Sequence, residues 1–231
     1  SLDQAKSKQE AAAVGADKLG GAFGTLKLAA AGAAAAILAY VSVDTARAVI
    51  AQADAVSLLD ARLRLAVGGA SEFKAAQTQL FQLAQSNGIG LSETVKLYTR
   101  LADPIKRLGG GMQEVIGVTN SFQKALQLGG VSAQKTTSTT LQFGQALGAG
   151  ALAGDEFKAL AEAAPRLLKA IAEGANLPIG QLKKLGSEGK LTAELVSNAL
   201  LSQRETLERE FATLPDTVGK SITRMANEVA Q

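Results

Sequence analysis

The stretch from Leu141 to Thr192 constrains this chain most, because glycine and proline interrupt it at short intervals. Alanine and leucine fill most of the rest and favour helices, so each interruption predicts the end of one short helix and the start of another. The stretch has almost no side chains suited to catalysis, and it therefore predicts a shaped structural module. The interrupting residues are Gly148, Gly150, Gly154, Pro165, Gly174, Pro178, Gly186 and Gly189.

The composition predicts helices packed through small side chains. Hydrophobic residues make up 47% of the 231 residues, yet only 4% are aromatic and tryptophan is absent. No run of useful length alternates β-branched or aromatic residues with polar ones, as a strand would. We predict an all-α fold, with a compact domain of short antiparallel helices and helical hairpins and a long Ala/Gly-rich helix near the N-terminus.

The residue types that are missing exclude most enzyme mechanisms. Histidine and cysteine are both absent, which removes the usual nucleophilic triads and the common zinc sites. We therefore predict no enzyme, no cofactor and no metal site. The net charge of +3 is spread along the chain, whereas a nucleic-acid interface needs a concentrated basic patch, so we expect no specific nucleic acid as a partner.

An apolar segment from Gly20 to Val41 precedes the rest of the chain. Its uninterrupted part, from Leu28, would span only about 21 Å as a helix, against about 30 Å for a bilayer core. A buried or partner-packed helix is therefore favoured, and membrane insertion stays open as the alternative. We divide the chain into a lead-in, residues 1–41, and a helical domain, residues 42–231.

Apolar periodicity predicts a series of helices in the first part of the domain. Expected helices run from Val41 to Val67, from about Phe73 to Asn87, from Ser92 as the cap to Leu108, from Met112 to Leu126, and from Ser132 as the cap to Leu147. Pairs of glycines close several of them. Within the third, Pro104 should kink or restart the helix, with Asp103 as the new cap.

A second set of helices follows after Gly154. Asp155 and Glu156 fall in the first turn of one helix, where negative charge is favourable, and Pro165 should start a new turn. Lys158, Glu162 and Arg166 share one side by their spacing of four. Gly174 suits a left-handed stop, and a last long apolar stripe runs from Leu195 to Leu214 before Pro215.

Two glycine motifs resemble nucleotide-binding sequences only superficially. The glycines at 148, 150 and 154 are spaced one residue too widely for a dinucleotide fingerprint, and no predicted strand precedes them. The Gly219-Lys220-Ser221 triplet matches the end of a phosphate-binding loop, but Leu214 stands where its first glycine belongs. We interpret the first as a turn between helices and the second as accidental.

The run QALGAGALAGDEFKALAEAAPRLLKAIAEGANLPIGQLKKLGSEGKLT resembles the tape measure proteins of long-tailed bacteriophages, in a domain from their N-terminal region. The resemblance extends from about Val49 to Glu228 through DAVSLLDARLRLAVG, LFQLAQSNGIGLSETVKLYTRL, KALQLGGVSAQKTT and FATLPDTVGKSITRMANEV. It is most specific from Gly150 to Pro165 and next from Gly189 to Thr192. The signature residues, all structural, are Gly150, Gly154, Asp155, Glu156, Pro165, Gly189, Lys190, Leu191 and Thr192.

The resemblance implies a structural protein that scaffolds the tail tube, sets tail length and is later released with the DNA. It implies tail tube, assembly chaperone and tail tip proteins as partners, with self-association and host membrane contact as further expectations. The implied location is the host cytoplasm during assembly and then the lumen of the virion tail. The host inner membrane on infection is a further expectation. It brings no catalytic residue. The alternative is a membrane-inserting or pore-forming module that acts during DNA ejection.

A measuring rod needs one uninterrupted helix, so that length follows residue number at about 1.5 Å per residue. This chain has 24 glycines and repeated helix stops. We also find no sustained heptad pattern of the kind that a long coiled coil needs. The sequence therefore predicts a compact domain attached to a rod.

Overall fold

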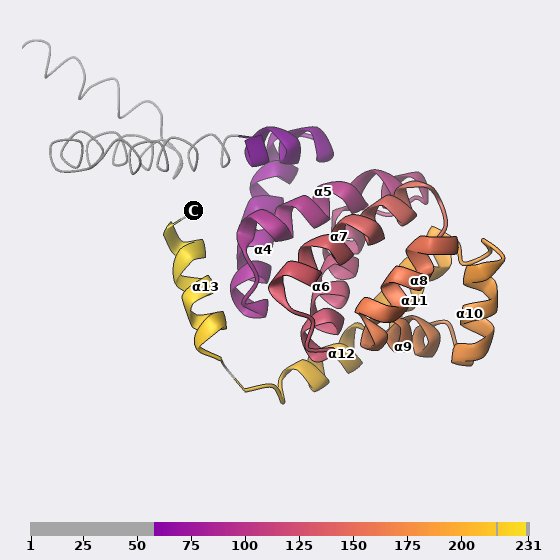
Figure 1. Cartoon of the computed structure of the whole chain (residues 1–231). Coiled ribbons are helices and arrows are strands. Elements are labelled where there is room, and N and C mark those ends of the chain that lie inside the picture. Colours follow the sequence, from indigo (N-terminus) through magenta and orange to yellow (C-terminus); the bar gives the residue numbers. More distant parts are fainter. Residues whose placement is uncertain (1–57, 216, 230–231) are drawn as a thin grey trace, which may run out of the picture. The chain divides into compact units, whose positions relative to one another are not determined.

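Helices account for every regular element within residues 58–215 and 217–229, which are the residues that the computed structural model describes (Figure 1). In this part of the chain the one pairing of extended backbone is an isolated bridge between single residues. The predicted all-α fold is confirmed. The expected Ala/Gly-rich helix, and with it the domain boundary proposed at residue 41, lies outside the described residues.

Short connections separate the helices, as the glycine and proline pattern predicted. A helix over residues 58–66 comes first. The others, in chain order, are α4 (Ala70–Asn87), α5 (Leu91–Arg107), α6 (Met112–Leu128), α7 (Ala133–Gly148), α8 (Gly154–Ala163), α9 (Pro165–Gly174), α10 (Ile179–Ser187), α11 (Ala193–Ser202), α12 (Arg204–Phe211) and α13 (Val218–Val229).

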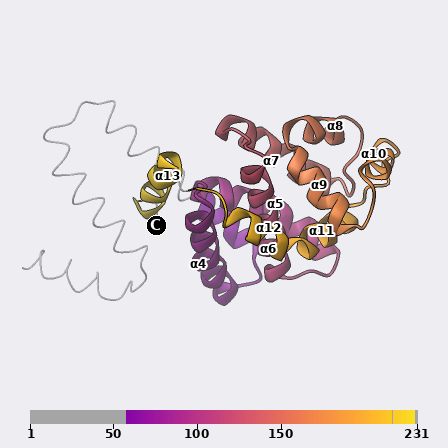
Figure 2. The same cartoon turned by 90° about the horizontal axis from the view of Figure 1, so that it is seen from below.

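Helix α6 lies at the centre of these helices (Figure 2). It contacts α4, α5, α9, α11 and α12, and it is therefore buried on most of its circumference. A helix that is enclosed in this way needs apolar side chains on several faces. Its Phe122 stacks on Phe143 of α7 with ring centroids 4.4 Å apart, and both rings are fully buried. These two rings, with Tyr98 of α5, are the largest buried side chains of the core.

Glycines allow two pairs of elements to approach closely. An added Cβ at Gly174 in α9 would lie 2.1 Å from the carbonyl oxygen of Ala199 in α11, far inside van der Waals contact. A Cβ at Gly186 would lie 2.5 Å from the ring of Phe157. The expected left-handed stop at Gly174 is wrong, because Asn176 takes that conformation, with φ of 55°. Gly174 is instead required by the close contact with α11.

Helix α5 continues through Pro104, so the predicted restart at this residue is wrong. The proline ring is buried, and only three residues of the helix follow it. The cost of the missing N–H is therefore confined to the end of the helix. Asp103, expected to cap a new helix, instead forms an ion pair with Arg107 at 2.9 Å.

The predicted cap of α5 by Ser92 is also wrong. The N-cap is Gly90, two residues before Ser92, and glycine has no side chain to cap the helix that begins at Leu91. The Thr94 N–H donates to the Gly90 carbonyl oxygen at 3.0 Å, so the helical bonds start before Ser92. The free N–H of Leu91 donates to Oδ1 of Asn227 in α13 at 2.8 Å, so a residue far along the chain satisfies one of the unpaired groups at the helix start.

The last long apolar stripe forms two helices, α11 and α12, where one was expected. The break is at Gln203, with φ of −88° and ψ of 1°. Just before it, the Ser202 hydroxyl donates to the carbonyl oxygens of Ala199 and Gly174, at 2.8 and 3.2 Å. Such side-chain bonds to backbone carbonyls compete with helix continuation.

Other predicted boundaries are confirmed. Helix α4 ends at Asn87 with Gly88 in the left-handed conformation, at φ of 62°. Ser132 caps α7 by accepting a hydrogen bond from the Lys135 N–H, and Pro165 is the first residue of α9. In each case the deciding residue type has one strong local preference.

A chain of buried polar side chains links α4, α5 and α6. Asn87 Nδ2 donates to Oε1 of Gln123 at 2.9 Å and to Oδ1 of Asn120 at 3.2 Å. Gln123 Nε2 in turn donates to the Thr94 hydroxyl at 2.9 Å. Because an unpaired buried amide is costly, these bonds favour one register of the three helices over others.

We predict that Gly174→Ala destabilises the domain by about 1–3 kcal/mol, because the added methyl group meets backbone that cannot rotate away. Gly180→Ala in α10 is the matched control. A Cβ there meets nothing within 4 Å, so the free energy of unfolding should stay unchanged or rise by up to about 1 kcal/mol. Urea denaturation followed by circular dichroism measures both. Equal effects of the two substitutions would contradict the close contact.

We predict that the domain loses stability between pH 10 and about 12 because of Tyr98. Burial, and secondarily the charge of Glu72, raises the pKa of Tyr98 to about 12. The unfolded chain therefore ionises first as pH rises, which favours unfolding in that interval. Among the described residues the buried Tyr98 hydroxyl has no hydrogen-bond partner, so Tyr98→Phe should leave stability at pH 7 nearly unchanged and remove the alkaline loss. The chain has two tyrosines, so a Tyr40→Phe variant leaves Tyr98 as the one that titrates. Ultraviolet titration of this variant measures the pKa of Tyr98 in the folded state, and a value near 10 would refute the prediction.

Candidate functional site

Two segments that the sequence analysis singled out lie side by side in the structure. The Gly150 carbonyl oxygen accepts a hydrogen bond from the Ala193 N–H, and the Leu152 N–H donates to the Leu191 carbonyl oxygen, both at 2.8 Å. Ala151 and Thr192 form the antiparallel bridge between these bonds. We call residues 150–152 and 191–193 the loop bridge. It joins the approach to α8 to the start of α11.

Three signature glycines have backbone conformations that L side chains rarely adopt. The φ angles of Gly150, Gly154 and Gly189 are 95°, 53° and 67°. A Cβ at Gly150 or Gly154 would meet no atom within 4 Å, so conformation, and not space, requires glycine there. These residues turn the chain into and out of the loop bridge.

The loop bridge is anchored by apolar burial and by a helix cap. Leu152 and Leu191 are both fully buried. Thr192 is the N-cap of α11, and its hydroxyl accepts a hydrogen bond from the Leu195 N–H at 3.2 Å. One short segment therefore pairs with another loop, fills the core and starts a helix.

The charged signature residues lie on the surface at helix ends. Asp155 and Glu156 are in the first turn of α8, and the Asp155 side chain is 97% exposed, 3.4 Å from Lys158. Lys190 pairs with Glu188 at 2.9 Å, also on the surface. Exposed carboxylates without a buried partner are poorly suited to acid–base catalysis. Their positions fit stabilisation of helix ends.

Signature residues line two depressions of the surface. One, of about 380 Å³, is lined by residues of α8, among them Gly154, and of α10. The other, of about 290 Å³, is lined by Pro104 and Leu108 near the end of α5, and by Gly150 and Thr192. The signature residues therefore shape the surface as well as the chain path.

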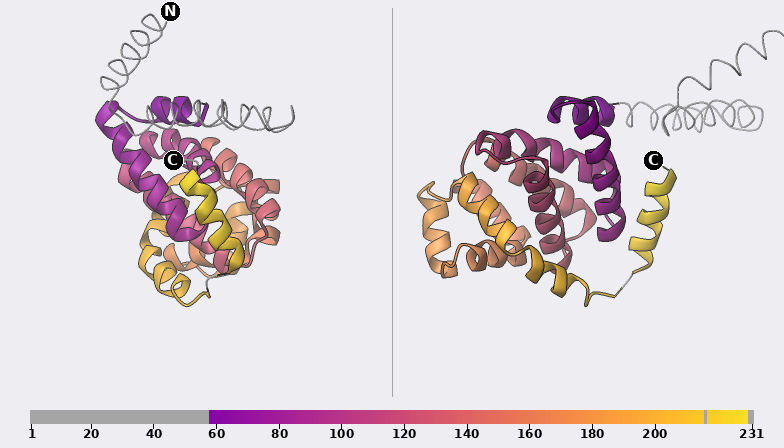
Figure 3. Two further views of the ribbon diagram at one scale, coloured as in Figure 1. Left: turned by 90° about the vertical axis from the view of Figure 1, so that its left-hand side faces the viewer. Right: turned by 180° about the vertical axis from the view of Figure 1, so that it is seen from behind.

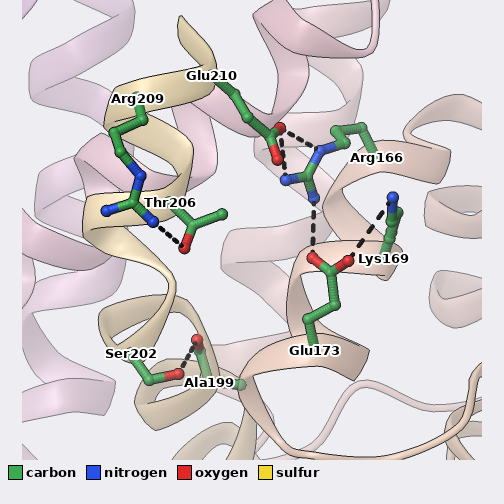
Figure 4. A network of polar contacts seen from close by, with 8 residues as sticks. All are labelled: Arg166, Lys169, Glu173, Ala199, Ser202, Thr206, Arg209 and Glu210. Atoms are coloured by element: carbon green, nitrogen blue, oxygen red, sulfur yellow. Dashed lines mark hydrogen bonds and ion pairs between the residues drawn. The ribbon is translucent and has the colours of Figure 1, made fainter.

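Sequence reasoning missed a group of charged residues that joins α9 to α12 (Figure 4). Arg166 donates from Nε and Nη2 to Glu210 Oε2, at 2.9 and 2.7 Å, and its Nη1 lies 3.6 Å from Glu173. The expected row of Lys158, Glu162 and Arg166 is wrong, because the break at Ala164 places Arg166 on another helix. No local pattern identifies Glu210, 44 residues away.

A second buried cation meets α12 beside the first. Lys124 of α6 has a side chain only 4% exposed, and it forms an ion pair with Glu208. Its Nζ also lies 5.3 Å from the centre of the Phe211 ring, and Nζ of Lys220 lies 4.5 Å from that centre. The distances fit cation–π attraction on α12.

The motif look-alikes occupy ordinary positions. The glycines at 148 and 154 end α7 and begin α8, as the interpretation of a turn predicted. Gly219, Lys220 and Ser221 lie within α13. Among the described residues no group of three or more His, Cys, Asp or Glu is arranged to hold a metal ion.

No helix in residues 58–215 and 217–229 has the length and apolar character needed to cross a membrane. The segment from Gly20 to Val41, for which membrane insertion stayed open, lies outside these residues.

The model of a protein family described as tape measure protein matches residues 47–231 of this chain. No curated protein and no solved structure matches the chain.

We predict that Thr192→Ala destabilises the domain by about 1 kcal/mol, because the α11 cap is lost. Thr192→Ser is the matched control and should retain nearly all the stability, since its hydroxyl can accept the same bond. Thermal unfolding followed by circular dichroism compares them. A Thr192→Ser variant as unstable as Thr192→Ala would show that the hydroxyl is not what matters.

Proposed function

We propose that this chain, which belongs to the tape measure protein family, contributes a compact assembly domain to a protein that sets tail length by another part of its sequence. Membership of the family makes the chain a structural component of a phage tail that associates with other tail proteins.

The lengths of the helices carry this proposal. The longest helix among the described residues, α4, has 18 residues, or about 27 Å of rise. The helices fold back on one another around α6, so adding or removing residues does not change a length in proportion. A domain of this kind supports binding and placement, whereas a ruler needs an extended helix.

The partners that we propose are the tail tube protein, tail assembly chaperones and tail tip proteins. The loop bridge, with the depression that Gly150 and Thr192 line, offers a surface of defined shape that such proteins can recognise. We further propose that the protein occupies the tail lumen, after assembly in the host cytoplasm, and leaves with the DNA. Self-association and contact with the host inner membrane belong to the same proposal.

The test is an in-frame deletion of residues 58–229 in a phage that carries this gene, with the intact gene supplied in trans as the control. Tails are measured by electron microscopy. If the domain serves assembly, the deletion lowers the yield of tails, and the few that form have the normal length.

If the deleted residues belonged to the measuring helix, the tails would be shorter by a definite length. Removing about 170 residues of a measuring helix would shorten tails by about 260 Å. A normal yield of tails shortened by that amount would refute the proposal. Co-expression of the 231-residue chain with each tail protein of the same phage tests the partners, and no association with any of them would also count against it.

A further inference from the structure

The last two described helices attach to the rest of the domain mainly through polar groups. We call α12 and α13 the arm, and helix 58–66 with α4 to α11 the body. Among the arm's described side chains, Leu207 is the only apolar one in the core, whereas α11 alone places four there, Ala193, Val196, Ala199 and Leu200. Figure 3 shows α13 alongside α4, at the end of the segment that follows α12.

Two ion pairs hold the first half of the arm, and in both of them the cation belongs to the body and the carboxylate to the arm. The body supplies the cations, Lys124 and Arg166, with side chains 4% and 12% exposed. The arm supplies the carboxylates, Glu208 and Glu210, which are 58% and 41% exposed. Because water reaches both carboxylates, dissolved ions can compete for these contacts.

The second half of the arm caps helix ends of the body. Asn227 Nδ2 donates to the Ile89 carbonyl oxygen at 2.9 Å, and its Oδ1 accepts from the Leu91 N–H at 2.8 Å. The Arg224 Nε donates to the carbonyl oxygen of Gln85, in the last turn of α4, at 2.9 Å. Water replaces such bonds at helix ends more readily than it replaces apolar contacts in a core.

Lys220 connects the two halves of the arm. It is the cation of α13 that lies over Phe211 of α12, and it packs on the body at Gly88, where an added Cβ would lie 2.7 Å from its Cγ. Loss of the α12 ion pairs therefore also disturbs the packing of α13 on the body. The halves should leave the body together.

We propose that the arm is a strap that detaches from the folded body as one unit when its ion pairs with Lys124 and Arg166 are lost. The body retains its own core, from Leu63 to Leu200. Detachment uncovers both cations and the space filled by Leu207. Arg166 keeps Glu173 as a partner, whereas for Lys124 no other carboxylate is within ion-pair distance among the described residues.

Hydrogen exchange of the 231-residue chain tests this, with Glu208→Gln/Glu210→Gln as the variant and Glu205→Gln as the matched control. Glu205 is on the same helix and is exposed, without an ion pair in the described structure. The variant should speed exchange in α12 and α13 together by at least about 10- to 100-fold, the factor expected for the net loss of one charge-assisted hydrogen bond. Exchange in α6 and α9 should change little, and Glu205→Gln should behave as the parent chain.

A salt titration tests the parent chain without substitution. Raising NaCl from about 0.1 to about 1 M shortens the range of charge interactions from about 10 to about 3 Å, so exchange in the arm should rise while the body stays protected. The double variant should respond much less, since its ion pairs are already removed.

Spin labels measure detachment directly. The chain has no cysteine, so Gln82→Cys on α4 and Met225→Cys on α13, both at exposed positions, can be labelled selectively. The labelled parent chain should give one narrow distance distribution, and the labelled Glu208→Gln/Glu210→Gln variant should add a longer, broad one. The proposal would be overturned if the distance distribution stayed narrow and unchanged both in the parent chain at high NaCl concentration and in the double variant. So would faster exchange spread equally through α6 and α9, or confined to α12 alone.

Discussion

The close approach of helix backbones is the constraint on which this domain depends. A chain with seven phenylalanines and no tryptophan has few large side chains to fill space between helices, so dense packing requires the helices themselves to come together. The contact of Gly174 with the Ala199 carbonyl oxygen sets α9 directly against α11. Helix α11 also packs on α5 and α6, so the same contact fixes the position from which the loop bridge begins. A glycine outside the loop bridge therefore helps to place the helix that begins there.

Dense packing around α6 has an electrostatic consequence. A helix with neighbours on most sides buries polar positions as well as apolar ones, and Lys124 is one of them. A buried ammonium group without a counter-charge is strongly unfavourable. Glu208 of α12 supplies the counter-charge, as Glu210 does for Arg166. Helix α12 thus supplies the carboxylates that pair with two cations of the body, besides the one leucine that it contributes to the core.

Local sequence predicted the helices and many of their ends, since glycine pairs, Ser132 and Pro165 have strong preferences of their own. Two of the failures involve contacts that are distant in sequence. Ser92 is a good cap by type, but α5 begins before it, at Leu91, whose N–H bonds to Asn227 of α13. Gly174 suits a left-handed turn, but a neighbouring helix requires it for space. A single sequence gives no access to such contacts. The same holds for the ion pairs of Arg166 and Lys124, whose partners lie 44 and 84 residues away. Pro104 differs, because it lies too near the helix end to break the helix.

The signature residues act in this structure through backbone geometry and helix capping, and not through reactive groups. Gly150, Gly154 and Gly189 have φ values that glycine adopts without strain. Thr192 combines a backbone bridge with a helix cap. None of these roles needs a reactive group, yet each tolerates few residue types, because backbone geometry selects them. A resemblance built from such residues concerns the path of the chain. Because the path of the chain sets the surface that the domain presents, a segment without catalytic chemistry can still have a defined shape.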